Sequence, residues 1–263
     1  MEWNMAFALT WMEKTLLDAG LKVAAQPGWK TRGHGDVGVT QGVMCHHTVG
    51  GKSLNMPSLG VITDGRPGLP GPLSQLGLGR DGTYYLVAAG RCFHAGKGNW
   101  QGFTSGNNNF IGIEAENTGY VTGPKAEAWS DVQMDAYRRG VAALLKHIKA
   151  KPIMACGHKE YALPHGRKPD PTFDMSVFRN DVAAIMAGTA PISLGIPKVD
   201  SEGRPTLRRG STGDLVEMVQ GKLGLAKSGT FDGTTEAAVR QFQALKGLVP
   251  DGIIGPRTWA SLV

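Results

Sequence analysis

Two apolar runs that each lead into a histidine constrain the fold of this chain more than any other feature. Residues 42–46 read Gly-Val-Met-Cys-His, and residues 152–157 lead directly into His158. Short apolar runs of this kind are typical of buried strands. Because side chains at the ends of neighbouring strands meet at one edge of a sheet, we expect His46 and His158 to converge there.

A stiff loop rich in Gly and Pro follows His158 and ends in a carboxylate. Residues 157–171 read Gly-His-Lys-Glu-Tyr-Ala-Leu-Pro-His-Gly-Arg-Lys-Pro-Asp-Pro, with Asp170 near the end. Two imidazoles and one carboxylate form a three-ligand set that leaves zinc a fourth position for water, as in catalytic zinc sites. We therefore predict that His46, His158 and Asp170 bind Zn²⁺.

Three further histidines are candidates for roles at this site. His165 belongs to the same loop as Asp170 and is a rival for the third ligand position. His47 follows His46, so strand alternation points it to the other face, where it supports the site or faces substrate. His94 ends another apolar run, and we predict that it also contacts substrate.

A hydrolytic zinc site also needs a base for its water, and residues 110–117 offer the best source. Alternation in this apolar run puts Glu114 and Glu116 on one face and Ile113 on the other. A carboxylate inside so apolar a strand is costly unless it is paired or functional, although an edge-strand surface carboxylate remains an alternative. Lys168 could stabilise a developing oxyanion, or it could be an exposed loop lysine.

The remaining periodicity indicates two domains joined by a linker. Residues 1–187 mix strand-like runs with helical patterns, which favours an α/β fold with a mixed central sheet flanked by helices. Strands are expected at 42–46, 74–79, 83–88, 109–115 and 152–157, and helices at 6–19, 129–150 and 174–187. Residues 51–73, rich in Gly and Pro, are expected to form a long surface excursion.

Residues 188–206 lack periodicity and read as a linker. Residues 207–263 read as a small three-helix domain, with helices at about 213–223, 234–246 and 256–262. Asp-Gly occurs at 232–233 and again at 251–252, which indicates a weak internal repeat.

Composition excludes several classes of protein. The 263 residues are 41% hydrophobic with a net charge of +6, and the basic residues form no block that would favour nucleic acid binding. The apolar runs are too short for a transmembrane segment, and the N-terminus lacks the pattern of a signal peptide. The three cysteines form no C-x-x-C pair and are expected to be buried thiols, and we expect a monomer.

Together, these motifs resemble the zinc-dependent N-acetylmuramoyl-L-alanine amidases, a class that includes phage lysins, anhydro-muropeptide amidases and peptidoglycan recognition proteins. The resemblance rests on six motifs in order: Cys-His-His-Thr at 45–48, Gly-Arg-Asp-Gly-Thr at 79–83, Phe-His-Ala-Gly at 93–96, Ile-Gly-Ile-Glu at 111–114, Gly-His at 157–158 and Gly-Arg-Lys-Pro-Asp-Pro at 166–171. The tail is similar to the three-helix peptidoglycan-binding domain, through residues 207–214, 237–243 and 247–259.

The resemblance implies the type-2 amidase fold, with His46, His158 and Asp170 as zinc ligands, Glu114 as acid/base and Lys168 as transition-state stabiliser. It implies a bacteriolytic endolysin that cleaves the amide between N-acetylmuramic acid and L-alanine with a zinc-activated water. Peptidoglycan would be its partner, reached from the host cytoplasm after release. The alternatives are a cytoplasmic enzyme that recycles anhydro-muropeptides, a non-catalytic recognition protein, and a lysin that disrupts membranes through residues 6–19.

Overall fold

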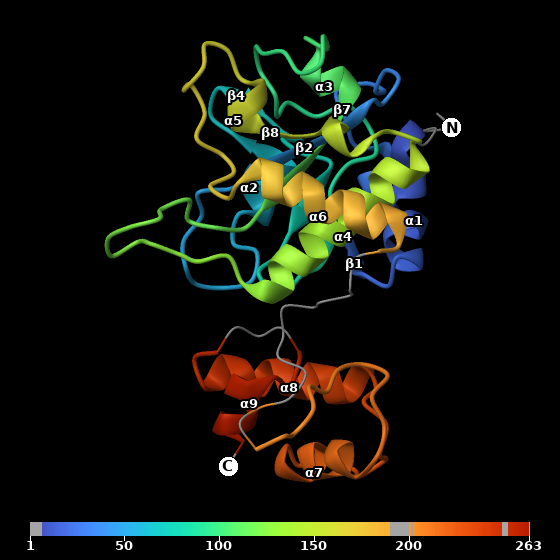
Figure 1. The fold of residues 1–263 in the computed structure, drawn as a ribbon, viewed down its shortest axis with the longest axis vertical. Coiled ribbons are helices and arrows are strands. Elements are labelled where there is room, and N and C mark those ends of the chain that lie inside the picture. The colour runs from blue at the N-terminus through green and yellow to red at the C-terminus, as the bar shows by residue number, and fades with distance from the viewer. Residues whose placement is uncertain (1–6, 190–199, 201, 249–251, 263) are drawn as a thin grey trace. The chain divides into compact units, whose positions relative to one another are not determined.

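The computed structural model describes residues 7–189, 200, 202–248 and 252–262 (Figure 1). The chain divides into two compact units, Met1–Ile192 and Ser193–Val263. Most of the predicted linker, residues 188–206, lies outside the described residues. The predicted domain limits therefore stay a prediction.

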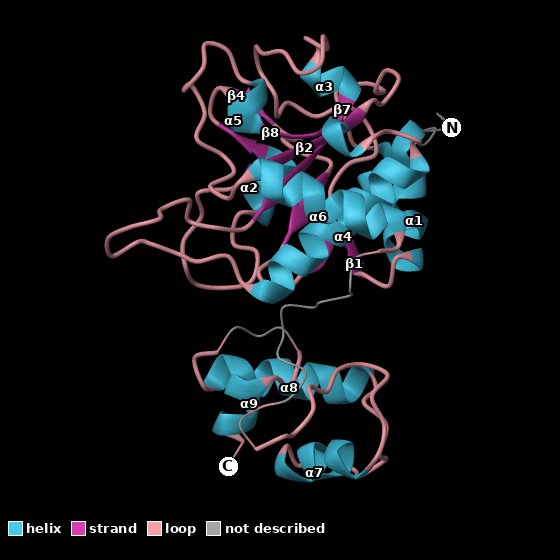
Figure 2. Cartoon of the chain, in the orientation of Figure 1, coloured by secondary structure: helices cyan, strands magenta, loops and turns pink. Residues whose placement is uncertain are grey.

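A mixed sheet forms the centre of the first unit. Its strands are drawn in magenta in Figure 2. Within the described residues the sheet has six strands in the order β1-β6-β5-β7-β2-β8. The β5–β6 pair is antiparallel, whereas β7, β2 and β8 lie side by side and run parallel. The strands are β1 (Lys22–Ala25), β2 (Gly42–His47), β5 (Leu76–Leu78), β6 (Thr83–Leu86), β7 (Phe110–Ala115) and β8 (Ala155–Gly157). The α/β class with a mixed central sheet is confirmed.

Three helices pack together against one face of this sheet (Figure 1). They are α1 (Met12–Asp18), α4 (Asp131–His147) and α6 (Met175–Ala187). The side chains of β2 alternate accordingly: Val43 and Cys45 join the core beneath the helices, whereas Met44 joins a separate apolar cluster. Since His46 shares the direction of Met44, it belongs to the face of the sheet opposite these helices.

Side-chain caps fix the starts of the two long helices. The hydroxyl of Ser130 accepts a hydrogen bond from the backbone N–H of Gln133 at 3.2 Å, so Ser130 is the N-cap of α4. The carboxylate of Asp174 accepts one from the backbone N–H of Ser176 at 2.7 Å, at the start of α6. Both helices therefore begin within two residues of the predicted positions.

The N-terminal segment is also helical, as η1 (Ala8–Trp11) followed by α1. Leu9, Met12 and Leu16 are buried in the core, whereas Leu17 is 52% exposed. The apolar side of this segment is therefore packed inside the first unit, which speaks against the membrane-disrupting alternative.

The segment 51–73 is more ordered than an open excursion. It holds α2 (Leu59–Asp64) and a hairpin of β3 (Gly65–Arg66) and β4 (Leu69–Pro70). Met56 and Ile62 pack with Val87 and Cys92 into a small core of their own. The short elements η2 (Trp29–Thr31), α3 (Gly106–Asn109), η3 (Pro152–Met154) and α5 (His158–Tyr161) complete the unit.

Three helices around one apolar core make up the described part of the second unit, as expected for the C-terminal region. They are α7 (Asp214–Lys222), α8 (Gly233–Leu245) and α9 (Pro256–Ser261). The core includes Val216, Phe231, Val239 and Trp259. Among the described residues of the whole chain, none of the helices is long and apolar enough to cross a membrane.

This unit contains an internal repeat built on two buried glutamines, Gln220 in α7 and Gln243 in α8. The side-chain NH₂ of each glutamine donates to the carbonyl ten residues later, at 3.0 and 2.9 Å, and to a threonine hydroxyl fifteen residues later, at 3.0 Å in both cases. The side-chain oxygen accepts the backbone N–H nine residues later, from Gly229 at 3.1 Å and Gly252 at 2.8 Å.

The two halves therefore hold their turns in the same way. Both glycines have positive φ, 67° and 74°, so the turn needs a residue without a side chain. The register differs from the one that the Asp-Gly pairs indicated, because the structural match joins Gly229 to Gly252 rather than Gly233 to Gly252. Asp251 lies outside the described residues.

Candidate active site

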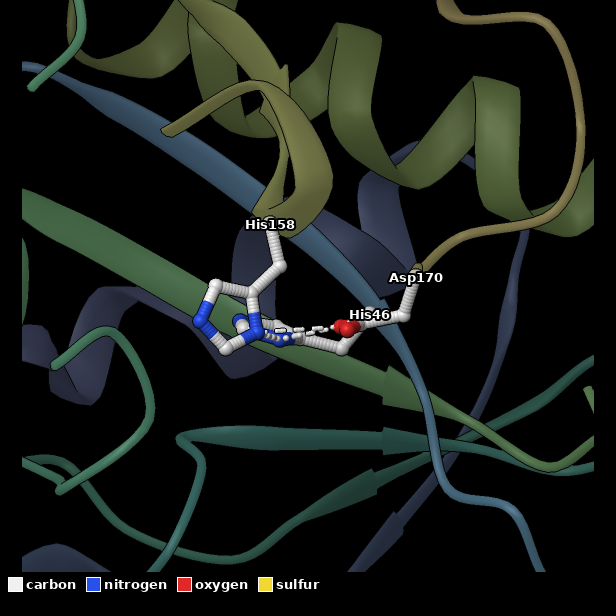
Figure 3. Close-up of side chains that lie close together, drawn as sticks. All are labelled: His46, His158 and Asp170. Carbon is white, nitrogen blue, oxygen red and sulfur yellow. Dashed lines mark hydrogen bonds and ion pairs between the residues drawn. The ribbon is translucent and has the colours of Figure 1, made fainter. Parts of the chain in front are cut away.

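The three predicted metal ligands converge at the edge of the sheet where β2 and β8 end. The Nδ1 atoms of His46 and His158 lie 3.0 Å apart, and the Oδ2 atom of Asp170 lies 3.1 and 3.0 Å from them (Figure 3). All three residues are buried, and they form the only group of this kind found among the described residues. The side chains point toward one another from three separate segments (Figure 3).

The local structure explains why each ligand sits where it does. The hydroxyl of Tyr137 on α4 accepts a hydrogen bond from the backbone N–H of His46 at 3.0 Å and lies 3.1 Å from its carbonyl. His158 is the first residue of α5, directly after β8. The backbone N–H of Lys159 donates to the carbonyl of Asp170 at 2.6 Å, which ties the end of the loop back to this helix.

The chemistry of this donor set fits a bound cation. The Nε2 atom of His158 lies 2.9 Å from the backbone carbonyl of Ala95, which can only accept a hydrogen bond, so Nε2 carries the proton. In a neutral ring, Nδ1 then presents a lone pair to the Asp170 oxygen 3.0 Å away. Two electron-pair donors at this separation are stabilised by a shared cation, and nitrogen with carboxylate oxygen suits Zn²⁺.

The electrostatics keep these ligands in their metal-binding forms. Burial, helped by the neighbouring His158, lowers the pKa of His46 to about 4, against the attraction of Asp170. Burial acts to raise the pKa of Asp170, but its interactions with the rings of His158 and His46 outweigh this and hold the pKa below its usual range. At neutral pH the set is therefore an uncharged imidazole at His46 beside a carboxylate.

Glu114 lies beside the three ligands on the neighbouring strand. His46 and Glu114 are register partners of β2 and β7, and the Oε1 atom of Glu114 lies 3.9 Å from His46 Nδ1. Its Oε2 atom is buried and has no hydrogen-bond partner among the described residues. Burial, reinforced by the charge of Asp170 and opposed by Lys168, raises the pKa of Glu114 to about 8. A carboxyl group that titrates near neutral pH is suited to taking up and releasing protons.

The loop residues divide into buried and exposed groups. Asp170 is 7% exposed and contacts both histidines. His165 is exposed and is not part of the ligand group. Lys168 is partly buried, and its charge acts on both His46 and Glu114. Lys168 therefore lies close enough to the site for its positive charge to act on these two groups.

The two histidines predicted to contact substrate lie in different surroundings. His47 is 4% exposed, and its ring packs against Gly119 and faces Trp129 at 6.4 Å between ring centroids. His94 is 8% exposed. Both of its ring nitrogens lie within hydrogen-bonding distance of other protein atoms, because Nδ1 is close to the ring of His46 and Nε2 is close to the carbonyl of Phe110. Burial, together with the two neighbouring imidazoles, lowers the pKa of His94 well below its usual range. Contact of either residue with substrate stays a prediction.

Glu116 has a different environment from Glu114, although the two alternate onto one face. It is fully buried, and its carboxylate accepts hydrogen bonds from the hydroxyl of Thr48 at 2.6 Å and from the backbone N–H of Ser58 at 2.9 Å. Glu116 therefore anchors the segment after β2 to the end of β7.

Sequence reasoning missed two residues that support the site. Tyr137 lay within the helix predicted at 129–150 but was not singled out, and neither was Asn107. The side-chain oxygen of Asn107 accepts the backbone N–H groups of His94 and Ala95 at 3.0 and 2.8 Å. The run of three asparagines at 107–109 was the available signal, because asparagine often bonds to nearby backbone in turns.

Comparison with protein families gives two matches. Residues 36–173, more than half of the chain, match the N-acetylmuramoyl-L-alanine amidase family. Residues 213–262 match a peptidoglycan binding domain. A protein of Kitasatospora aureofaciens with no assigned function is 42% identical over 69 residues, which cover 24% of this chain, and the chain spans 58% of the length of that relative.

Several solved structures are also similar to this chain. The N-acetylmuramyl-L-alanine amidase AmiD from E. coli, solved with an anhydro-muropeptide substrate, is 18% identical with a TM-score of 0.44, and the match covers 88% of this chain and 90% of AmiD. The endolysin LysCS from Clostridium intestinale is 18% identical with a TM-score of 0.42, covering 60% of this chain and 93% of its own. Given the family match across residues 36–173, the chain belongs to the N-acetylmuramoyl-L-alanine amidase family.

Proposed function

We propose that this chain is a zinc-dependent endolysin that hydrolyses the amide bond between N-acetylmuramic acid and L-alanine in the bacterial cell wall. The observation that carries the proposal is the buried group of His46, His158 and Asp170 with Glu114 at 3.9 Å from His46. It supports hydrolysis because it joins a metal-binding donor set to a carboxyl group whose pKa lies near neutrality.

The residues would divide the reaction as follows. His46, His158 and Asp170 would hold the zinc ion, which would supply the Lewis acidity that polarises a carbonyl and lowers the pKa of water. Glu114 removes a proton from the attacking water and later gives it to the leaving amine nitrogen, so that one carboxyl group serves both steps. The ammonium of Lys168 stabilises the negative charge that develops on the carbonyl oxygen.

The second unit is evidence that the substrate is the insoluble cell wall. Its match to a peptidoglycan binding domain indicates that it holds the enzyme on the wall and so raises the effective concentration of scissile bonds. Retention on the wall suits an enzyme that acts on the intact polymer, which is our reason for proposing an endolysin.

Digestion of purified sacculi followed by mass spectrometry tests the proposal directly. We expect new L-alanine N-termini with the full chain and none with Glu114→Gln, whereas Glu13→Gln on α1 serves as a matched control that keeps activity. Binding to sacculi without new N-termini would identify a recognition protein instead. Deletion of residues 188–263 should reduce turnover of sacculi but not of soluble anhydro-muropeptides. An enzyme that prefers the soluble fragments and is unaffected on sacculi by the deletion would be a recycling amidase.

A further inference from the structure

The segment His94–Ala95 touches both histidine ligands of the candidate metal site. The ring of His94 contacts His46, with His94 Nδ1 lying 3.2 Å from His46 Nε2. The next residue, Ala95, accepts the ring proton of His158 on its backbone carbonyl at 2.9 Å. One dipeptide therefore contacts, on each ligand, the ring nitrogen that faces away from Asp170.

The hydrogen-bond partners determine which nitrogen carries the proton in each of the two rings, His94 and His46. His94 Nε2 lies 3.2 Å from the carbonyl oxygen of Phe110, and because a carbonyl only accepts, this nitrogen carries the proton. The other nitrogen of a neutral ring, Nδ1, is then an acceptor. His46 must therefore donate from Nε2, which leaves the lone pair of His46 on Nδ1, facing Asp170.

We propose that His94 is a positioning residue that holds His46 in the tautomer able to bind the metal through Nδ1. The opposite tautomer of His46 would turn the lone pairs of His46 Nε2 and His94 Nδ1 toward each other at 3.2 Å, or would require His94 to give up its bond to Phe110. Either change leaves a buried polar group unpaired, which is costly. This inference rests on the proposed zinc-dependent function.

The residues around His94 hold its ring and its backbone in place. The two rings meet edge-on, with an interplanar angle of 89°. Asn107 accepts both backbone N–H groups of the His94–Ala95 segment, so the acceptor for the ring proton of His46 and the acceptor for the ring proton of His158 are fixed together. A Cβ atom on Gly112 would lie 2.9 Å from Cγ of the His94 ring, which explains why this strand position, two residues before Glu114, is a glycine.

The first test is the tautomer itself, read by ¹⁵N NMR of the histidine rings in the zinc-loaded full chain. We expect the proton of His46 on Nε2. Finding it on Nδ1 in the unmodified protein would overturn the proposal, and this measurement needs no variant. It is also independent of catalysis, so a correct tautomer with no amidase activity would count against the proposed function alone.

The second test is zinc affinity, measured by competition with a chromogenic chelator. His94→Phe keeps the ring volume but removes the acceptor, and loss of such a supporting hydrogen bond should weaken zinc binding about 10–100-fold. His94→Asn can place an oxygen where Nδ1 lies and should recover part of that loss. His34→Phe is the matched control, because His34 stacks on Phe93 next to His94 with 3.7 Å between ring centroids.

Zinc affinity within about twofold of the parent in His94→Phe would refute the role of His94. Equal losses in His94→Phe and His34→Phe would also refute it, since they would trace the effect to packing. If the parent chain binds no zinc, the proposed function fails together with this inference.

Discussion

Replacing Glu114 with glutamine should change how the stability of the metal-free protein depends on pH. The side chain of Glu114 is mostly buried and feels the charge of Asp170, and its pKa rises from 4.5 to about 8 in the folded chain. Glutamine has the same shape but does not ionise. The substitution therefore removes the titration and keeps the packing.

The direction and size follow from linkage between folding and proton binding. Because the folded state holds the proton more tightly than the unfolded state, Glu114 costs nothing below pH 4.5 and destabilises the fold increasingly as pH rises toward 8. At about 1.36 kcal/mol per pKa unit, the full penalty above that pH is about 5 kcal/mol. Of this, about 3.5 kcal/mol develops between about pH 5 and pH 8.

Thermal unfolding of both proteins in chelator, across this pH range, measures the difference. His46, whose pKa falls to about 4, contributes an opposite slope at acidic pH, but it is present in both proteins and largely cancels. The melting temperature of the parent should fall relative to Glu114→Gln by about 7–14 °C between the two ends of the range. Parallel profiles would show that Glu114 titrates normally, which would refute the argument that burial tunes it as a base.

Three further predictions concern the ligands and the supporting hydrogen bonds. Asp170→Ala should abolish zinc binding in a chelator competition assay, whereas His165→Ala should bind zinc like the parent; the reverse pattern would mean that the ligand assignment is wrong. Tyr137→Phe removes the hydroxyl that pairs with the backbone of His46 and should lower the free energy of unfolding by about 1–3 kcal/mol, read from denaturant titration; no change would exclude a structural role for that hydroxyl. Gln243→Ala leaves the buried backbone N–H of Gly252 without its acceptor and removes one of the donors to the carbonyl of Ile253, which still accepts from the Thr258 hydroxyl. It should destabilise the second unit by about 1–3 kcal/mol, seen as faster amide exchange in α8. The exposed Gln241→Ala is its control, and equal exchange in the two variants would contradict the prediction.

The sequence predicted the parts of the fold that depend on local pattern. Strand alternation assigned Glu114 and Ile113 to opposite faces, and the structure places Ile113 in the core beneath the helices. The ends of β2 and β8 meet as expected, because parallel neighbours finish at one edge. Strand β1 was missed because only four residues form it and its alternation is weak.

The supporting residues of the site could not be predicted, because their role depends on contacts between distant segments. His94 lies 48 residues from His46 and Tyr137 lies 91 residues from it, so no spacing rule links them. Glu116 shows the same limit: alternation grouped it with Glu114, but its bonds to Thr48 and Ser58 come from a loop whose path the sequence does not reveal. The Asp-Gly pairs indicated a repeat in the tail, but in the wrong register, because the repeat is set by the hydrogen bonds of Gln220 and Gln243 to Gly229 and Gly252.

The ligands of the candidate metal site are far apart along the chain, and this has a consequence for biosynthesis. His46 and Asp170 are separated by 124 residues, and His46 and His158 by 112. A nascent chain therefore cannot assemble the full ligand set until about two thirds of the protein has been synthesised and strands β2, β7 and β8 have paired. A metal ion that binds only this assembled set stabilises the folded state and not the unfolded chain, so the supply of zinc would set how much of the newly made protein remains folded.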